Sequence, residues 1–269
     1  MIRKLALAAA ALALIAPLAS AQTLDEVLAK HYEAMGGYEK LKAVQSVRMT
    51  GKMIMGQGME APFTIEKSRP NKFRMEFTFQ GMTGTQAFDG KGGWMIMPFS
   101  GKKDPEAMPA DAVKEMEEQA DFDGPLVDWK AKGHTVELLG KEDVEGTSAH
   151  KLKATLKNGN VITYYIDAET FLVLKEESKR TIKGTEVEGE SSVGDYKQVE
   201  GLTMPFAIEM GAKGSPQKQK LVTEKVEINP KVEDARFVMP AVAAKPDSAG
   251  AKSAAKDVKT AAAKKTDKK

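Results

Sequence analysis

Three histidines, His31, His134 and His150, are the side chains of this sequence best suited to metal binding or to proton transfer near neutral pH. They are expected on the first helix, at the start of a strand and within a strand, and no spacing pairs two of them as metal ligands. The chain also lacks HExxH, GxSxG and a glycine-rich loop that opens a helix. The sequence therefore predicts neither an enzyme nor a metal or cofactor site.

The acidic residues expected in loops also do not indicate a catalytic site. Asp121 and Asp123 flank Phe122, where carboxylates are expected to be solvated or to cap a helix rather than to catalyse a reaction. Asp167 precedes Ala168-Glu169-Thr170, and its side chain is expected to accept hydrogen bonds from the backbone of a turn.

Apolar side chains form a clearer pattern in the stretch NKFRMEFTFQGM, residues 71–82. Phe73, Met75, Phe77 and Phe79 alternate with polar residues, which predicts a strand with one apolar face. Methionine and phenylalanine fill space without imposing one arrangement, so such a face adapts to a guest more readily than a Leu- and Val-rich core. The pattern indicates a surface that binds hydrocarbon, although a permanent core without a ligand stays open.

The same parity recurs in the preceding strands and extends the predicted cavity. The residues expected to line it are Met49, Met53, Met55, Phe63, Ile65, Phe73, Met75, Phe77 and Phe79, with Trp94 and Ile96 added to them. The basic residues Arg48 and Arg74 fall on the outward parity of their strands.

Most of the chain is predicted to position this face as β-structure. Short segments of strand pattern alternate with turn signals such as Asn158-Gly159-Asn160, which is typical of an antiparallel meander. We expect a mainly β fold in which one curved antiparallel sheet of ten to twelve strands forms a half-open barrel. A helix that begins after Thr23, with Glu26 completing a capping box, is expected to help cover the concave face.

A second helical segment is expected between Asp104 and Lys130, with a joint at Gly124-Pro125. It is predicted to act as a lid through Val113, Met116, Phe122, Leu126 and Trp129. Two behaviours stay open: a lid that swings at the joint when a ligand enters, and an amphipathic cover that never moves.

The ends of the chain predict export. Residues 1–21 place Arg3 and Lys4 before an apolar run and a small-residue site, the layout of a cleavable signal peptide. We therefore expect a periplasmic domain over residues 22–240. The chain has no cysteine, which excludes disulfides, thiolate sites and a lipid-anchored N-terminal cysteine.

Residues 241–269 are rich in lysine and alanine and are expected to be a disordered tail. The tail holds eight lysines and three aspartates, whereas residues 22–240 hold 30 basic and 35 acidic residues. Because the basic residues of the domain are interspersed with acids, no nucleic-acid partner is expected. Contact of the tail with anionic surfaces and a role as a solvated spacer both stay open.

Several strings place the chain beside a known family. They are HYEAMGGYEKLKAVQSVRMTGKM, FDGKGGWMIMP, FDGPLVDWKAKG, YYIDAETFLVLKEE, DYKQVEGLTMPFAIEM and VEINPKVEDARFVMP. In their order and spacing they resemble the outer-membrane lipoprotein-sorting proteins, a superfamily of periplasmic lipoprotein carriers and their relatives, over almost all of residues 23–240.

The resemblance implies a half-barrel that shields the acyl chains of a lipid or lipoprotein during transport toward the outer membrane. It also implies a possible inner- or outer-membrane protein partner, and an inward arginine near the cavity mouth in carriers of the lipoprotein-sorting type. A lipid-responsive sensor that regulates the cell envelope is the alternative function, and the sequence does not separate it from a carrier.

Overall fold

The computed structural model describes residues 22–182 and 184–241, so the predicted signal peptide and the tail from residue 242 on lie outside the described residues. Three α-helices accompany thirteen strands in this part of the chain. The helices are α1 (Leu24–Ala34), α2 (Tyr38–Ala43) and α3 (Ala110–Ala120). The strands are β1 (Ser46–Met55), β2 (Met59–Ser68), β3 (Lys72–Phe79), β4 (Met82–Phe88), β5 (Gly93–Met97), β6 (Lys102–Ala107), β7 (Thr135–Val144), β8 (Thr147–Thr155), β9 (Val161–Asp167), β10 (Val173–Ile182), β11 (Thr185–Val199), β12 (Leu202–Ala212) and β13 (Lys218–Ile228).

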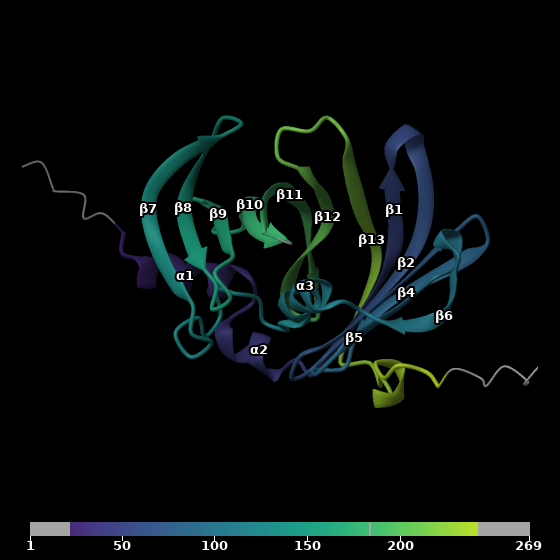
Figure 1. The fold of residues 1–269 in the computed structure, drawn as a ribbon. Coiled ribbons are helices and arrows are strands. Elements are labelled where there is room, and N and C mark those ends of the chain that lie inside the picture. The colour runs from purple at the N-terminus through teal and green to yellow at the C-terminus, as the bar shows by residue number, and fades with distance from the viewer. Residues whose placement is uncertain (1–21, 183, 242–269) are drawn as a thin grey trace, which may run out of the picture.

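All thirteen strands form one antiparallel sheet, in the order β6-β5-β4-β3-β2-β1-β13-β12-β11-β10-β9-β8-β7. Two meanders, β1 to β6 and β7 to β13, join where β1 pairs with β13. A bulge interrupts this pairing at Gly51, where an added Cβ would lie 2.0 Å from the carbonyl oxygen of Val222. The sheet bends so strongly that its two ends face each other with α3 between them (Figure 1). The predicted open, curved antiparallel sheet is confirmed.

The strand count exceeds the prediction of ten to twelve because β6 lies where a helical segment was expected to begin. Pro105 falls within β6, and β6 is the edge of the sheet. An edge strand tolerates proline, because one of its sides needs no backbone donor. Residues 108–134 then carry the chain, including α3, from this edge to β7 at the opposite edge.

The N-terminal helix begins as predicted. The Thr23 hydroxyl accepts from the backbone N–H of Glu26, and the Glu26 carboxylate accepts from the backbone N–H of Thr23 at 2.8 Å. Residues Tyr38 to Ala43 form the six-residue helix α2. No helix among the described residues is both long and apolar enough to span a membrane.

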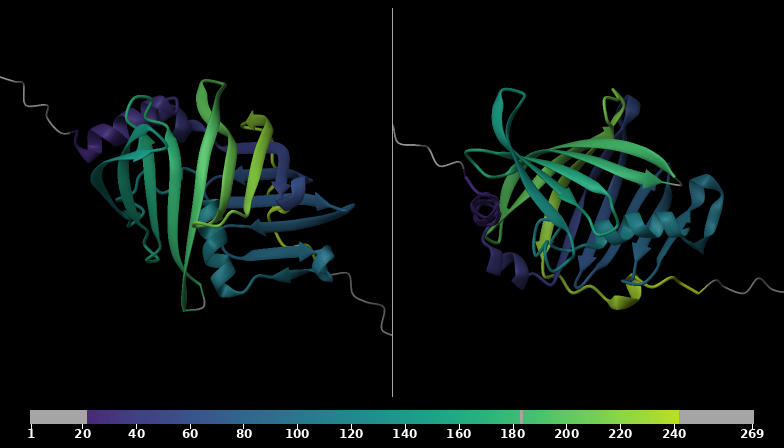
Figure 2. Two further views of the ribbon diagram at one scale, coloured as in Figure 1. Left: turned by 90° about the horizontal axis from the view of Figure 1, so that it is seen from above. Right: turned by 60° about the vertical axis from the view of Figure 1, so that its left-hand side comes forward.

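The C-terminal segment, residues 229–241, lies along the side of β1 to β5 that faces away from α3 (Figure 2). Phe237 is fully buried there, and its carbonyl oxygen accepts from the Trp94 indole at 2.7 Å. Glu66, also buried, accepts from Arg48 at 2.9 Å and from Arg236 at 2.6 Å. The outward position predicted for Arg48 is therefore confirmed, and a network of charges attaches the segment to the sheet.

Two buried histidines join α1 to β8 and the turn before β10. The ring of His31 donates through Nδ1 to the carbonyl oxygen of Phe171 at 2.8 Å, and the ring of His150 stacks on Phe171 with 5.7 Å between centroids. Burial lowers the pKa of both histidines below the ordinary value. The neutral rings are therefore part of the native packing.

We expect the domain to lose stability as the pH falls below about 6.5, the unperturbed histidine pKa. A histidine with a lowered folded-state pKa contributes stability above its unfolded pKa, and this stability is lost as the pH falls through the folded pKa. Urea unfolding at pH 7.5, 6.5 and 5.5 measures the effect. His150→Phe keeps the stack on Phe171, so it should reduce the loss between pH 7.5 and 5.5. An equal loss in the variant and the wild type would contradict this role.

Candidate functional site

The nine residues predicted from alternation in β1, β2 and β3 lie on one face of the sheet. In the antiparallel pairing, Met49 is opposite Ile65, and Ile65 is opposite Met75. Phe63 is likewise opposite Phe77. Residues directly opposite each other point to the same side of a sheet, so these side chains form continuous rows across the strands. We call the side of the sheet that carries them the inner face.

Helix α3 covers part of this inner face. Met116 and Ala120 are buried against Phe73 and Phe88, and Val113 packs against the same cluster. Of the nine predicted residues, three are buried and the other six keep part of their surface exposed. The six are Met49, Met55, Ile65, Met75, Phe77 and Phe79. An apolar row that is covered at one end and half-exposed along the rest is a surface on which hydrocarbon can lie.

The inner face continues beyond the predicted residues onto the second meander. Met53 lies opposite Leu221, and Leu221 lies opposite Ile208. Both added residues are half-buried and apolar. Alternation within a strand could not identify this extension, because it depends on the long-range pairing of β1 with β13.

Phe77 belongs to an aromatic pair near the β3–β4 hairpin, for which Gly84 makes room. Its ring packs against Phe99, with 5.4 Å between centroids. Both rings lie over Gly84, where a Cβ would come within 2.9 Å of each. A side chain at position 84 would displace the two rings, so glycine preserves an aromatic pair at this end of the inner face.

Trp94 and Ile96 do not belong to the inner face, so their predicted place in the cavity is wrong. The register puts Trp94 opposite Ala87 and Ile96 opposite Thr85, whereas Met95 is opposite Gln86 in the row of Met75. Trp94 instead packs on the outer side, where the guanidinium of Arg74 lies 5.4 Å from its ring. Parity does not carry across the loop between β4 and β5, so it could not fix the orientation of β5.

The five predicted lid residues are distributed over three parts of the molecule rather than along one helix. Val113 and Met116 belong to α3, and Phe122 packs in the cluster around Val47 and Leu202. Leu126 and Trp129 pack against α1 and the second meander. Residues 125–133 form turns, so the predicted helix after Gly124-Pro125 is absent.

Side chains from α2 and the β2–β3 turn hold the segment around the Gly124-Pro125 joint. Asp123 accepts from Arg69 Nη1 at 2.8 Å and from Lys42 Nζ at 2.9 Å. Lys42 also donates to Asp128 at 2.9 Å. Burial acts to raise the pKa of Asp123, but the hydrogen bonds from Arg69 and Lys42 outweigh it and hold that pKa below its ordinary value. Both sides of the joint are thus tied to the body of the protein.

Arg69 is a residue that sequence reasoning missed. Its guanidinium lies 4.5 Å from the Phe122 ring centroid and donates to the carbonyl oxygens of Val44 and Leu41 as well as to Asp123. It follows β2 directly, outside the alternating stretches in which the parity of Arg48 and Arg74 was read. No periodic signal could therefore place it.

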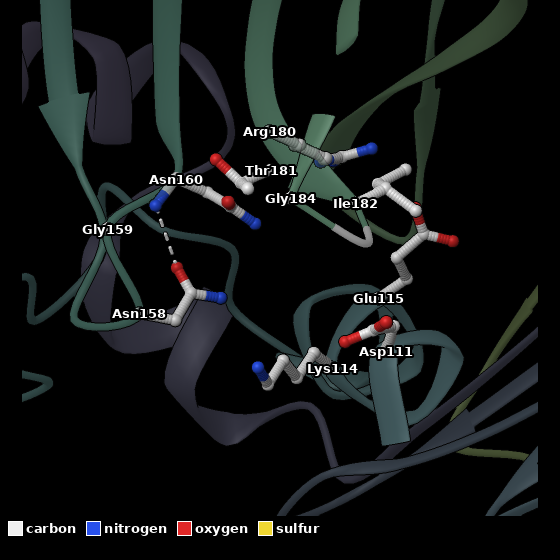
Figure 3. Close-up of a pocket in the computed structure, with 10 residues that line it drawn as sticks. All are labelled: Asp111, Lys114, Glu115, Asn158, Gly159, Asn160, Arg180, Thr181, Ile182 and Gly184. Carbon is white, nitrogen blue, oxygen red and sulfur yellow. Dashed lines mark hydrogen bonds between the residues drawn. The ribbon is translucent and has the colours of Figure 1, made fainter. Parts of the chain in front are cut away.

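Helix α3 is fastened to the second meander by Glu118. The Glu118 carboxylate accepts from Asn158 Nδ2 at 2.7 Å and from Asn160, and it lies 3.3 Å from Arg180 Nε. A pocket of about 300 Å³ opens beside this contact, between α3 and the ends of β9 and β10 (Figure 3). A second pocket of about 520 Å³ lies along Glu117 and Glu118, on the side of Pro70 and His134. Helix α3 therefore makes apolar contacts with the inner face on one side. On its other side it makes polar contacts, which the two pockets flank.

The candidate catalytic groups of the sequence do not form one cluster. His31 and His150 both contact Phe171, whereas His134 accepts from the backbone N–H of Lys157 at 3.1 Å. Asp121 is paired with Lys132 at 2.6 Å. Asp167 accepts from the backbone N–H groups of residues 169 and 170, which confirms its role in a turn. The described residues contain no group of three potential ligands that could hold a metal ion.

Two charged residues on the inner face also escaped sequence reasoning. Lys67 lies opposite Val47 and Phe73, and its ammonium donates to the carbonyl oxygen of Asp121 at 3.3 Å. Burial lowers the pKa of Lys67 to about 8. Glu176 lies opposite Tyr164, and burial raises its pKa to about 7.

Comparison with known proteins identifies the fold. No family model matches the chain, and no curated protein matches it either. Among solved structures, an outer membrane lipoprotein-sorting protein domain from Vibrio parahaemolyticus is 14% identical with a TM-score of 0.54, over 79% of this chain and 94% of that one.

Two further structures are similar over comparable lengths. A LolA superfamily protein from Nitrosomonas europaea is 14% identical with a TM-score of 0.55, over 81% of this chain and 98% of that chain. A DUF1329 family protein from Desulfovibrio piger is 11% identical with a TM-score of 0.51, over 80% and 96%. The predicted resemblance to the lipoprotein-sorting fold is confirmed.

Proposed function

We propose that this protein binds the acyl chain of a lipid or lipoprotein on the inner face, beneath α3, and does not catalyse a reaction. The proposal rests on the half-exposed apolar rows that run across the inner face from β3 to β12. Burying one methylene stabilises a complex by about 0.8 kcal/mol, so a chain of about sixteen carbons gains on the order of 12 kcal/mol before ordering costs.

The proposed place of action is the periplasm, with transport of the bound chain toward the outer membrane. The signal-like sequence of residues 1–21 and the shared fold with a lipoprotein-sorting domain support this role. The lysine-rich sequence of residues 242–269 supports contact with anionic surfaces, and a membrane-protein partner would deliver or receive the chain.

Displacement of a fluorescent fatty-acid probe from the purified protein tests the binding proposal. Saturable binding at about one probe per protein, with displacement by unlabelled fatty acid, is the expected result. Absence of saturable binding would contradict it.

We further propose that α3 is the movable part of the cover and that Glu118 restrains it. Bonds on both sides of Gly124-Pro125 hold that joint. Asp121 at the end of α3 is also bonded, to Lys132 and Lys67, whereas the described side-chain bonds of Ala110–Ala120 itself are those of Glu118. A ligand would then enter by lifting α3 from Phe73 and Phe88.

Glu118→Ala is expected to increase the association rate of the probe about tenfold, because a hydrogen bond to a charged group contributes about 1.5 to 3 kcal/mol. Stopped-flow fluorescence measures the rate. Glu115→Ala is the matched control, since Glu115 lies on the same helix and lines the pocket without joining this contact. Equal rates for Glu118→Ala and the wild type would show that α3 does not limit entry.

A further inference from the structure

Glu176 occupies the middle of β10 and belongs to the inner face. It lies opposite Tyr164 of β9, which in turn lies opposite Leu152 of β8. On its other side it lies opposite Ser191 of β11. Leu152 and Tyr164 are buried in the cluster that α1 covers, so this row points to the same side as α1.

The Glu176 carboxylate has no partner in the part of the chain that the structure describes. Burial raises its pKa to about 7, only the charge of Arg180 acts in the opposite direction, and no hydrogen bond lowers it. The residue nevertheless keeps part of its surface exposed. Part of the residue therefore stays accessible to a group that approaches along the inner face.

Among the groups facing Glu176, Arg180 alone offsets its negative charge, and it does so without a hydrogen bond or ion pair. The guanidinium of Arg180, on the same face of β10, lies against Glu118 of α3 at 3.3 Å. Tyr196 of β11 donates to the carbonyl oxygen of Val173 at 2.9 Å, and Tyr164 is a neutral phenol whose pKa burial raises. Asp121 at the end of α3 is already paired with Lys132. An ionised Glu176 therefore contributes one negative charge without an ion-pair partner to the inner face.

We propose that the ligand is a long-chain amphiphile with an ammonium group, and that this group pairs with Glu176 while the chain lies on the apolar rows. The inference rests on the proposed function and names the class of ligand. An ammonium ion supplies both the opposite charge and the hydrogen-bond donors that a desolvated carboxylate lacks. Lys67 is the residue of the inner face that would suit an anionic head group. Its ammonium already donates to the carbonyl oxygen of Asp121 and lies near the carboxylates of Asp121 and Asp123.

Displacement of the fluorescent probe by dodecylammonium, dodecanoate and dodecanol tests the proposal, because the three share one chain and differ in the head. At pH 8 we expect dodecylammonium to bind about tenfold more tightly than dodecanol, a difference of about 1.4 kcal/mol. This advantage should shrink as the pH falls below 7, should be lost in Glu176→Gln, and should persist in Glu177→Gln. Glu177 is a matched control, because it neighbours Glu176 in β10 but pairs with Lys175 and Lys213.

A stability measurement gives a second readout. The folded-state pKa of Glu176 is raised, so its contribution to stability is present at low pH and is lost as the pH rises through about 7. Glu176→Gln should therefore raise the melting temperature of the unliganded protein at pH 8 while removing the preference for ammonium.

The outcomes separate this inference from the proposed function. If all three chains bind equally, or if Glu176→Gln keeps the preference for ammonium, the ammonium site is wrong and chain binding stands. Tighter binding of dodecanoate would indicate an anionic head at Lys67 and would overturn the inference. If none of the three displaces the probe and the probe itself does not bind, both proposals fail.

Discussion

Phe77→Asp is expected to weaken probe binding by at least about a hundredfold, since an unpaired carboxylate in an apolar site costs several kcal/mol. Phe77 lies on the inner face, half-buried, in the row of Phe63 and against Phe99. An aspartate there would place a charge where the hydrocarbon chain is proposed to lie. Isothermal titration with a fatty acid measures the loss.

Thr78→Asp provides the control, because Thr78 is the next residue of β3 and points to the opposite face. Its hydroxyl contacts that of Thr83 at 3.0 Å, away from the proposed chain. This variant should bind the probe as the wild type does. Circular dichroism on both variants would separate lost binding from lost folding. A folded Phe77→Asp protein with unchanged affinity would show that the inner face does not bind the chain.

Arg69→Met is expected to destabilise the domain by about 3 kcal/mol, because removing one partner of a buried ion pair leaves the other without its bonds. The Asp123 side chain is 8% exposed and accepts from Arg69 through both oxygens. Lys42 would still neutralise part of its charge. The carbonyl oxygens of Leu41 and Val44 would lose a donor as well.

Urea denaturation at pH 7 measures this effect. Lys153→Met removes an exposed pair with Glu137 at 3.5 Å and should change the free energy of unfolding by less than about 1 kcal/mol. A loss below about 1 kcal/mol in Arg69→Met would mean that the segment around Gly124-Pro125 is held by its apolar contacts alone.

Local patterns predicted the parts of this molecule that local interactions determine. The Thr23–Glu26 capping box and the alternation of Phe73 to Phe79 both depend on residues close in sequence. They gave the start of α1 and nine residues of the inner face. The turn at Asp167 followed from the same kind of evidence.

Features that depend on distant pairing or burial could not be predicted. Leu221 and Ile208 join the inner face only because β13 pairs with β1. Trp94 faces outward, where Phe237, 143 residues later, supplies its acceptor. Glu176 is one polar residue in a charged strand by sequence. Only the surrounding fold shows that burial raises its pKa and that no residue within 22–182 or 184–241 pairs with it.

The central claim is that hydrocarbon from outside the chain occupies the inner face. Purifying the protein from its native host, extracting it with organic solvent and analysing the extract by mass spectrometry tests this claim most directly. The account predicts about one chain-bearing lipid or lipoprotein fragment per protein molecule, depleted in a Phe77→Asp preparation made in parallel. An extract without stoichiometric lipid, from a protein that also fails to bind the fluorescent probe, would contradict the account.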